Sequence, residues 1–450
     1  MALIRRGACT FYLKSFNAQQ AGAVGVALYN NTSGRFSPTV AGSPAITIPV
    51  VAISRADGEL LNDRLALGPV DITWTGQSGS FPNPTGGLIS SFSSYGLSPD
   101  LALKPDIGAP GGSIFSTFPL ESGGYATLSG TSMSSPHVAG AVALLLQAHP
   151  DTKAKNVRSI LQNSAKPAPW WGNPGLGFLD NVHRQGAGML QIDDAITATT
   201  TVEPGKLSLG ESQSGPVTRE IEISNNTEDT VTYDLSYVNA LSTGGIITPT
   251  FWGSDAVVTF DKQSVTLDDE EEEEIKVTIT APTGPDKGQY GGYIILTPRE
   301  GGQVYRVPFA GFIGDYQSIE VFANPFGLPL LTDQFFDDTV TTFSLVGDDL
   351  PNFLVHLDHQ SRIFKMEAFN ASTGKSVGNI LQLEYMVRNS TTTGFFAFPW
   401  DGTTTKGKKT FTVPNGQYYV QVSVLKALGK SKNSADWEVW TSPVFDIARP

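Results

Sequence analysis

One segment of the sequence, GTSMSSPHVAG at residues 130–140, surrounds a serine with the features that a nucleophile needs. Gly130 allows a close approach of the backbone, and Ser132 begins a long apolar run that predicts a helix. The first turn of a helix presents N–H groups without intrahelical partners and the positive end of the helix dipole. A tetrahedral intermediate on Ser132 would place its oxyanion near these donors, so the pattern predicts acyl transfer. The tripeptide Gly-Thr-Ser alone would indicate only an ordinary helix N-cap.

A serine hydroxyl is a weak nucleophile until a base, itself oriented by a third group, accepts its proton. The five histidines of the chain are His137, His149, His183, His356 and His359. The first follows Ser132 by five helical positions, about 140° around the axis, so its ring cannot reach back. The second ends the same predicted helix, the third lies in a predicted loop, and the last two lie in a distal β-rich region. We predict that none of the five activates Ser132.

The segment resembles the serine motif of subtilisin-like serine proteases, the subtilases, and the preceding SSFSSYG and PDIGAPGGSIFST agree with it. The resemblance implies a serine endopeptidase that cleaves peptide bonds through an acyl-enzyme on Ser132, whose own N–H is one oxyanion donor. It implies that the Thr131 hydroxyl assists the oxyanion and that Asp106, in PDIGAP, is structural. Met133 is expected to pack beside the site, where oxidation to the sulfoxide would crowd it.

In the family, the catalytic Asp and His precede the Ser along the chain. This sequence contains no Asp-Ser-Gly or Asp-Thr-Gly, and no His followed by Gly-Thr. We therefore expect the chain to lack the triad Asp and His and the oxyanion Asn, and to be inactive by itself. The alternative is a non-catalytic interaction or scaffold protein built from the same modules.

Residues 1–76 alternate β-type runs with helix-like runs. The β-type runs are 2–7, 24–30, 47–54 and 70–76, and the helix-like runs are 11–22 and 55–66. The stretch RRGACTFYLKSFNAQQAGAVGVALYNN resembles the protease-associated domain, a small α/β module inserted into several protease families. The match begins part-way into that domain, so we expect further strands of the natural domain before Met1.

Three more segments follow. We interpret 77–198 as the C-terminal part of a subtilisin-like peptidase domain, with helices predicted at 155–165 and 187–198. From about residue 200 the apolar pattern has period two, and seven short strands predict a β-sandwich. The segment TVEPGKLSLGES resembles the start of a fibronectin-type-III-like domain, assigned here to 200–312. Residues 313–450 predict a second sandwich, with a turn at Asn415–Gly416. The fold class is thus multidomain: α/β, then β-sandwiches.

Composition excludes some classes of function. The net charge is -13, and nothing resembles a basic stripe, which argues against a nucleic-acid partner. The longest apolar run, 138–146, is far shorter than the roughly 20 residues of a membrane-spanning helix and predicts a buried helix. The acidic run Asp268 to Glu274 predicts a solvated turn between strands, because a straight run rarely gives the converging oxygens of a Ca²⁺ site. We expect no cofactor and no metal; the partners are protein or peptide substrates.

The compartment follows from the resemblance more than from composition. The single cysteine, Cys9, forms no internal disulfide, which slightly favours an intracellular protein. The N-terminus lacks the apolar core of a signal peptide. The resemblance implies an extracellular protein, free or held at the cell wall. Sequons for N-glycosylation stand at Asn30, Asn31, Asn225, Asn370 and Asn389.

Overall fold

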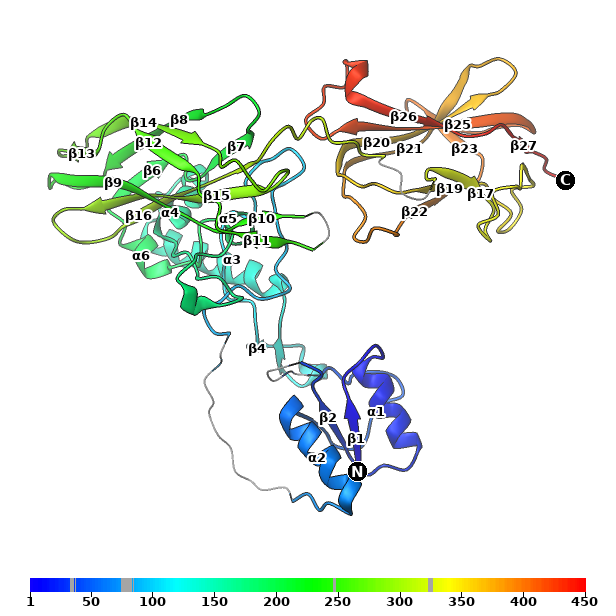
Figure 1. Ribbon diagram of the computed structural model, residues 1–450, viewed down its shortest axis with the longest axis horizontal. Coiled ribbons are helices and arrows are strands. Elements are labelled where there is room, and N and C mark those ends of the chain that lie inside the picture. The colour runs from blue at the N-terminus through cyan, green and yellow to red at the C-terminus, as the bar shows by residue number, and fades with distance from the viewer. Residues whose placement is uncertain (33–35, 37, 74–82, 84, 246–247, 323–326) are drawn as a thin grey trace. The chain divides into compact units, whose positions relative to one another are not determined.

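The computed structural model describes residues 1–450 except 33–35, 37, 74–82, 84, 246–247 and 323–326 (Figure 1). Two compact units, residues 1–82 and 83–450, make up the chain, and each is described by itself. The predicted fold class, an α/β portion followed by β-sandwiches, is confirmed.

The first unit is a three-stranded parallel sheet with two helices. The strands are β1 (Ala2–Arg5), β2 (Val26–Tyr29) and β3 (Val50–Ile53), in the order β1-β2-β3. The helices α1 (Phe11–Gln20) and α2 (Arg55–Leu67) lie on opposite sides of the sheet in Figure 1. Thr10 and Ser54 cap them, each accepting a hydrogen bond from an N–H of the first turn. The predicted alternation is confirmed through residue 67.

The β-type run predicted at 70–76 is wrong for the part that the structure describes. Residues 70–73 form no strand; residues 74–76 lie outside the described residues. Val70 and Ile72 instead line a cavity with Leu61 and Leu65 of α2. The apolar alternation at 70–72 therefore reflects packing against a helix, not pairing with a strand.

The described residues of 83–198 carry four helices and one hairpin. The hairpin joins β4 (Ile114–Thr117) to β5 (Tyr125–Leu128) through the short 3₁₀ turn η1 (Leu120–Ser122). The helices are α3 (Thr131–Ala148), α4 (Ala154–Ser164), α5 (Val182–Gln185) and α6 (Ile192–Ile196), with the 3₁₀ turn η2 (Pro174–Leu176) before α5. The helix predicted at 155–165 is confirmed, whereas that predicted at 187–198 shrinks to the five residues of α6.

Helix α3 is not the buried helix that its composition predicts. Only Ala141 and Leu145 are buried, while Leu144 is 49% and Leu146 38% exposed. These two are the neighbours of the buried Leu145 in the sequence, and each projects from another face because successive residues turn by about 100°. The helix therefore packs along one stripe and leaves an apolar face open within this chain.

Residues 200–312 form a β-sandwich with one core. One sheet has the order β12-β14-β8-β6; the other contains β11-β10-β15-β16-β7, with β9 paired to β15 and β13. Its strands are β6 (Thr200–Glu203), β7 (Leu207–Glu211), β8 (Val217–Asn225), β9 (Val231–Asn239), β10 (Ser242–Gly244), β11 (Thr250–Trp252), β12 (Val257–Phe260), β13 (Ser264–Leu267), β14 (Glu272–Thr280), β15 (Gln289–Pro298) and β16 (Tyr305–Phe312).

All seven predicted strands of this sandwich are present, and the prediction missed β6, β10, β11 and β16. Strand β16 is buried at every position except Arg306 and contains Pro308. A strand covered on both faces shows no alternation, and an internal proline argues against a strand. The acidic run is divided: 268–271 form the turn, and Glu272, Glu273 and Glu274 begin β14.

Residues 313–450 have a separate core and two sheets. These have the orders β17-β19-β22 and β18-β27-β25-β20-β21-β23-β24, with β26 paired to β25. The strands are β17 (Leu330–Thr332), β18 (Thr342–Phe343), β19 (Asn352–Val355), β20 (Ser361–Asn370), β21 (Ser376–Met386), β22 (Phe396–Pro399), β23 (Thr403–Lys406), β24 (Lys409–Thr412), β25 (Gly416–Lys426), β26 (Trp437–Thr441) and β27 (Phe445–Ile447); the 3₁₀ turn η3 (Ser434–Asp436) precedes β26.

The sandwich of 200–312 packs on the helical segment before it. Helix α4 contacts β6 and β16, and α5 contacts β15 and β16. Lys206, in front of β7, bonds back to the segment before α3: its ammonium group donates to the Leu103 carbonyl at 2.6 Å and to Asp106 Oδ1 at 2.7 Å. The helical segment and the sandwich are therefore one packed body.

Candidate active site

Two glycine-containing loops fix the start of α3. The Gly130 N–H donates to the Gly111 carbonyl at 2.8 Å, and the Met133 N–H donates to the Gly130 carbonyl at 3.0 Å. A Cβ on Gly111 would overlap Ser134 Oγ and lie 2.8 Å from the Gly130 carbonyl oxygen. Only glycine at 111 lets the loop approach the first turn of α3 this closely.

Ser132 lies on this first turn and is exposed. Gly130, the N-cap residue, offers no side chain to the free N–H groups of the turn, so the Ser132 N–H is open to an incoming acceptor. Within the described residues, the Ser132 hydroxyl makes no hydrogen bond. Thr131 is exposed beside it, and Met133 is half-buried with its sulfur near Gly130. An exposed hydroxyl next to unpaired backbone donors suits attack on a carbonyl.

The histidines are engaged elsewhere, with one exposed exception. His149 Nε2 lies 2.7 Å from the Ile196 carbonyl oxygen, His183 Nε2 lies 2.7 Å from Thr243 Oγ1, and His356 Nδ1 lies 2.6 Å from the Gly394 carbonyl oxygen. The ring of His359 packs against the Tyr316 ring at 4.5 Å. His137 is exposed on α3. Among the described residues, no imidazole is hydrogen-bonded to Ser132.

His183 is the histidine least suited to accept a proton. It is fully buried, and burial, assisted by the charge of Arg184, lowers its pKa to about 3. Its imidazole therefore stays neutral at ordinary pH and joins α5 to β10 through Thr243. This role is structural.

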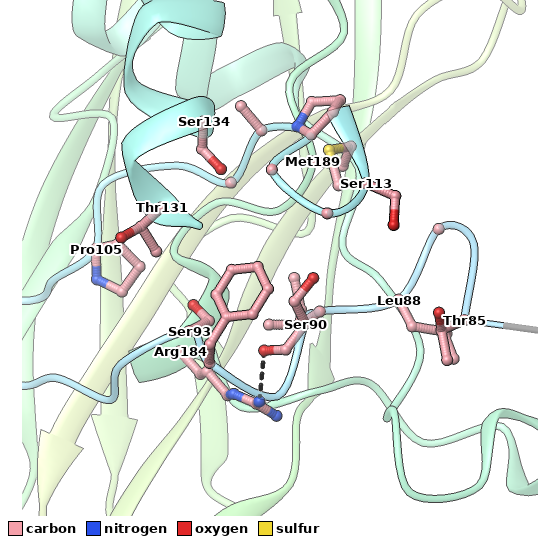
Figure 2. Close-up of a pocket in the computed structure, with 18 of the residues that line it drawn as sticks. Thr85, Leu88, Ser90, Ser93, Pro105, Ser113, Thr131, Ser134, Arg184 and Met189 are labelled. Carbon is pink, nitrogen blue, oxygen red and sulfur yellow. Dashed lines mark hydrogen bonds between the residues drawn. The ribbon is translucent and has the colours of Figure 1, made fainter. Parts of the chain in front are cut away.

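Arg184 was not singled out by the sequence, and it lies in the wall of a pocket beside the start of α3. The pocket has a volume of about 530 Å³ and is lined by Thr131, Ser134, Ser90 and Arg184 among others. Figure 2 shows Thr131 and Ser134 on α3 and, across the pocket, Arg184 with its hydrogen bond to the Ser90 carbonyl.

Arg184 is held in a buried setting. Its guanidinium group lies 3.5 Å from Asp180, 5.0 Å from the centre of the Tyr95 ring and 5.5 Å from that of Trp171. Burial raises the pKa of Asp180, against the opposing effect of Arg184. These contacts join residues 90–95 to α5, and no periodicity in the sequence could reveal them.

Asp106 has the surroundings of a structural carboxylate. It pairs with Lys104 and with Lys206. Burial acts to raise its pKa, but the hydrogen bonds and charges of the two lysines outweigh burial, so the pKa of Asp106 lies below its ordinary value. A carboxylate held ionised between two ammonium groups is a strong anchor and a poor proton acceptor.

The sequon asparagines differ in accessibility. Asn30, Asn225 and Asn389 are buried, and Asn225 Nδ2 donates to the carbonyls of Asp229 and Asp268. Asn31 and Asn370 are partly exposed. Glycosylation stays a prediction, and the surface favours the last two positions.

Two further observations bound the chemistry. In the part of the chain that the structure describes, no three His, Cys, Asp or Glu side chains gather in the manner of a metal site. None of the described helices combines the length and the apolarity that crossing a membrane requires.

Comparison with known proteins matches residues 10–190 to the Subtilase family and residues 207–310 to an Fn3-like domain. Residues 10–190 belong to the subtilase family. The chain is 30% identical to the minor extracellular protease Vpr of Bacillus subtilis (strain 168), over 99% of this chain and 50% of Vpr. The chain therefore spans half the length of that protease.

Other relatives share shorter segments. A PII-type proteinase of Lactococcus lactis subsp. cremoris is 29% identical over 70% of this chain and 18% of its own length. The C5a peptidase of Streptococcus pyogenes is 38% identical over 37% of this chain and 14% of its own length. The subtilase match spans Ser132 and the loops that fix it, and the Fn3-like match spans most of the sandwich of 200–312.

Proposed function

We propose that this chain carries the nucleophile of a subtilisin-like serine endopeptidase, which cleaves peptide bonds through an acyl-enzyme on Ser132. The observation that carries the proposal is the exposed Ser132 hydroxyl on the first turn of α3, beside backbone N–H groups that no side chain caps. Ser132 Oγ attacks the carbonyl carbon of the substrate, and the oxyanion that forms accepts a hydrogen bond from the Ser132 N–H. The Thr131 hydroxyl assists the oxyanion, the C–N bond breaks, and the amine leaves with the proton that a base has taken from Ser132; water then hydrolyses the ester on Ser132.

The proton of Ser132 needs an acceptor that none of the five histidines provides in the described structure. We therefore propose that the catalytic His and Asp, and the oxyanion Asn, come from polypeptide outside these 450 residues, and that this chain alone is inactive. The open apolar face of α3, with Leu144 and Leu146 exposed, supports this proposal because a face of this kind needs cover.

The other segments have proposed roles as well. Residues 1–76 act as a protease-associated domain that limits which substrates enter, residues 77–198 are the C-terminal part of the peptidase domain, and the sandwiches at 200–312 and 313–450 position the enzyme or bind partners. The substrates are proteins or peptides, and the protein is extracellular, as the name of the relative Vpr suggests. The second candidate is a non-catalytic scaffold, favoured because no imidazole lies at Ser132 among the residues that the structure describes.

Labelling with a fluorophosphonate separates these functions. We expect this chain alone to label no faster than its Ser132→Ala variant, because an unactivated hydroxyl reacts slowly. Addition of a subtilase segment that contains the Asp and His motifs should produce labelling that the Ser132→Ala variant lacks. Rapid labelling of the chain alone would disprove the absence of a base. Failure to label in an assembly that circular dichroism shows to be folded would favour the scaffold.

A further inference from the structure

A second pocket, here called the joint pocket, lies where three parts of the second unit meet. Its volume is about 250 Å³. Tyr95 and Leu97 come from the subtilase segment, Lys287 and Phe312 from the Fn3-like sandwich, and His359 from the last sandwich. Among the described residues, it shares no lining residue with the pocket beside α3. The joint pocket is thus separate from the proposed catalytic site.

The joint pocket has an excess of positive charge although the chain carries a net charge of -13. Lys287 and Arg388 line it, opposed by one carboxylate, Asp358. These charges also act on the pKa of His359, which lies at about 4. Burial lowers this pKa most, and the positive charges of Arg388, Lys287 and Lys426 lower it further, whereas Asp358 acts to raise it. With His359 neutral, the lining charges leave about one positive charge for a ligand.

One polar atom in the wall of the joint pocket is buried and, among the described residues, makes no hydrogen bond. Within the described residues, His359 Nε2 is buried without a hydrogen-bond partner, while the nearby Tyr316 hydroxyl is already occupied, donating to the Pro99 carbonyl at 3.1 Å and accepting from Gln360 at 2.9 Å. A buried polar atom without a partner costs free energy that a bound group can recover.

The remainder of the lining is apolar or aromatic. Leu97, Phe312 and Ile319 contribute, together with the rings of Tyr95 and Tyr316. Small-molecule sites combine such walls with a few polar groups that fix orientation. A strongly hydrated anion such as phosphate suits this wall poorly, whereas an anion attached to an apolar group would use both parts.

We propose that the joint pocket binds a small organic monocarboxylate that carries an apolar or aromatic group. Its carboxylate accepts hydrogen bonds from Lys287 and His359, and its apolar group packs between Leu97 and Phe312. Because the lining comes from three parts of the chain, the bound ligand ties the last sandwich to the subtilase segment. This inference does not rest on the proposed catalytic activity.

Calorimetric titration of the full chain tests the proposal. The probes are N-acetyl-L-phenylalanine, its uncharged amide and inorganic phosphate. The acid should bind about 10- to 100-fold more tightly than the amide, as expected for a charge-assisted hydrogen bond, and more tightly than phosphate. Equal binding of acid and amide would refute an anion site. Equal or tighter binding of phosphate would refute the proposal that an apolar group of the ligand contributes to binding.

Matched variants locate the binding in the joint pocket. Lys287→Gln should lower the affinity for N-acetyl-L-phenylalanine about tenfold. The control Lys375→Gln, at an exposed position before β21, should leave this affinity unchanged. An anion favours the charged imidazole, so affinity should rise as the pH falls from 7 to 5, and His359→Gln should abolish that rise. Equal effects of the two lysine variants would place the binding elsewhere and overturn the proposal. Weaker binding of N-acetyl-L-phenylalanine to a Lys287→Gln variant whose thermal unfolding is unchanged would support the proposal.

Discussion

The bond network of Lys206 gives a sharp test of how the Fn3-like sandwich is attached to the subtilase segment. Its side chain is only 16% exposed, and its ammonium group donates to Asp106 and to the carbonyl of the fully buried Leu103. The substitution Lys206→Met keeps most of the apolar stem and removes the donors. It leaves the Leu103 carbonyl without this partner and Asp106 with Lys104 alone.

The expected loss is about 2–4 kcal/mol in the free energy of unfolding. An orphaned buried carbonyl costs about 1–3 kcal/mol, and the lost ion pair adds about 1 kcal/mol because Lys104 continues to neutralise Asp106. Urea unfolding followed by tryptophan fluorescence measures it. The matched control is Lys276→Met: Lys276 lies 3.8 Å from Glu220, both side chains are more than half exposed, and the change should stay below about 0.5 kcal/mol.

The pH dependence of this difference follows from Asp106. Its folded pKa lies below the ordinary value of 3.8, because the lysines outweigh burial. The stabilisation is therefore fully present above that value and is lost as the pH falls through the folded pKa. The difference between wild type and Lys206→Met should stay constant from pH 7 to pH 5 and narrow below pH 4. A difference smaller than that of Lys276→Met, or one that widens in acid, would refute the reasoning.

Two further predictions concern the first turn of α3. Gly111→Ala should lower the stability of this chain by about 1–3 kcal/mol through overpacking. Gly140→Ala, within α3 and with open space around it, should be neutral or stabilising by up to about 1 kcal/mol; equal urea midpoints would contradict this. In an assembled active enzyme, peroxide should reduce the activity of wild type but spare Met133→Ala; equal losses in both would refute a role for Met133.

Local patterns in the sequence predicted the features that depend on neighbouring residues, but not those that depend on long-range packing. Ser132 at the start of α3 and the strands with clean alternation, such as β8 and β14, were predictable because spacing along the chain encodes them. Strand β16 was not, because burial on both faces erases the alternation. The exposure of Leu144 depends on which elements pack on α3, and that information is not in the apolar run itself.

Tertiary contacts of polar side chains could not be predicted from the sequence, for a different reason. Arg184 contacts Asp180, four residues before it in the sequence. It also contacts Ser90, which precedes it by 94 residues, and Tyr95. Lys206 meets Asp106 across the border between two domains. Neither pairing follows from periodicity or composition, because isolated arginines and lysines usually lie in solvent.

The contacts that position Ser132 join residues that are close in sequence, and this has a consequence for how the proposed catalytic site would form. Gly111, Gly130 and Ser134 set the turn through bonds and close approaches within 24 residues, so the nucleophile and its N–H donors take shape without a base nearby. Transfer of the Ser132 proton, by contrast, needs a base within hydrogen-bonding reach, most often an imidazole. If the proposed function holds, a preformed turn would dock against the segment that carries the base, and the same contact would cover the open face of α3.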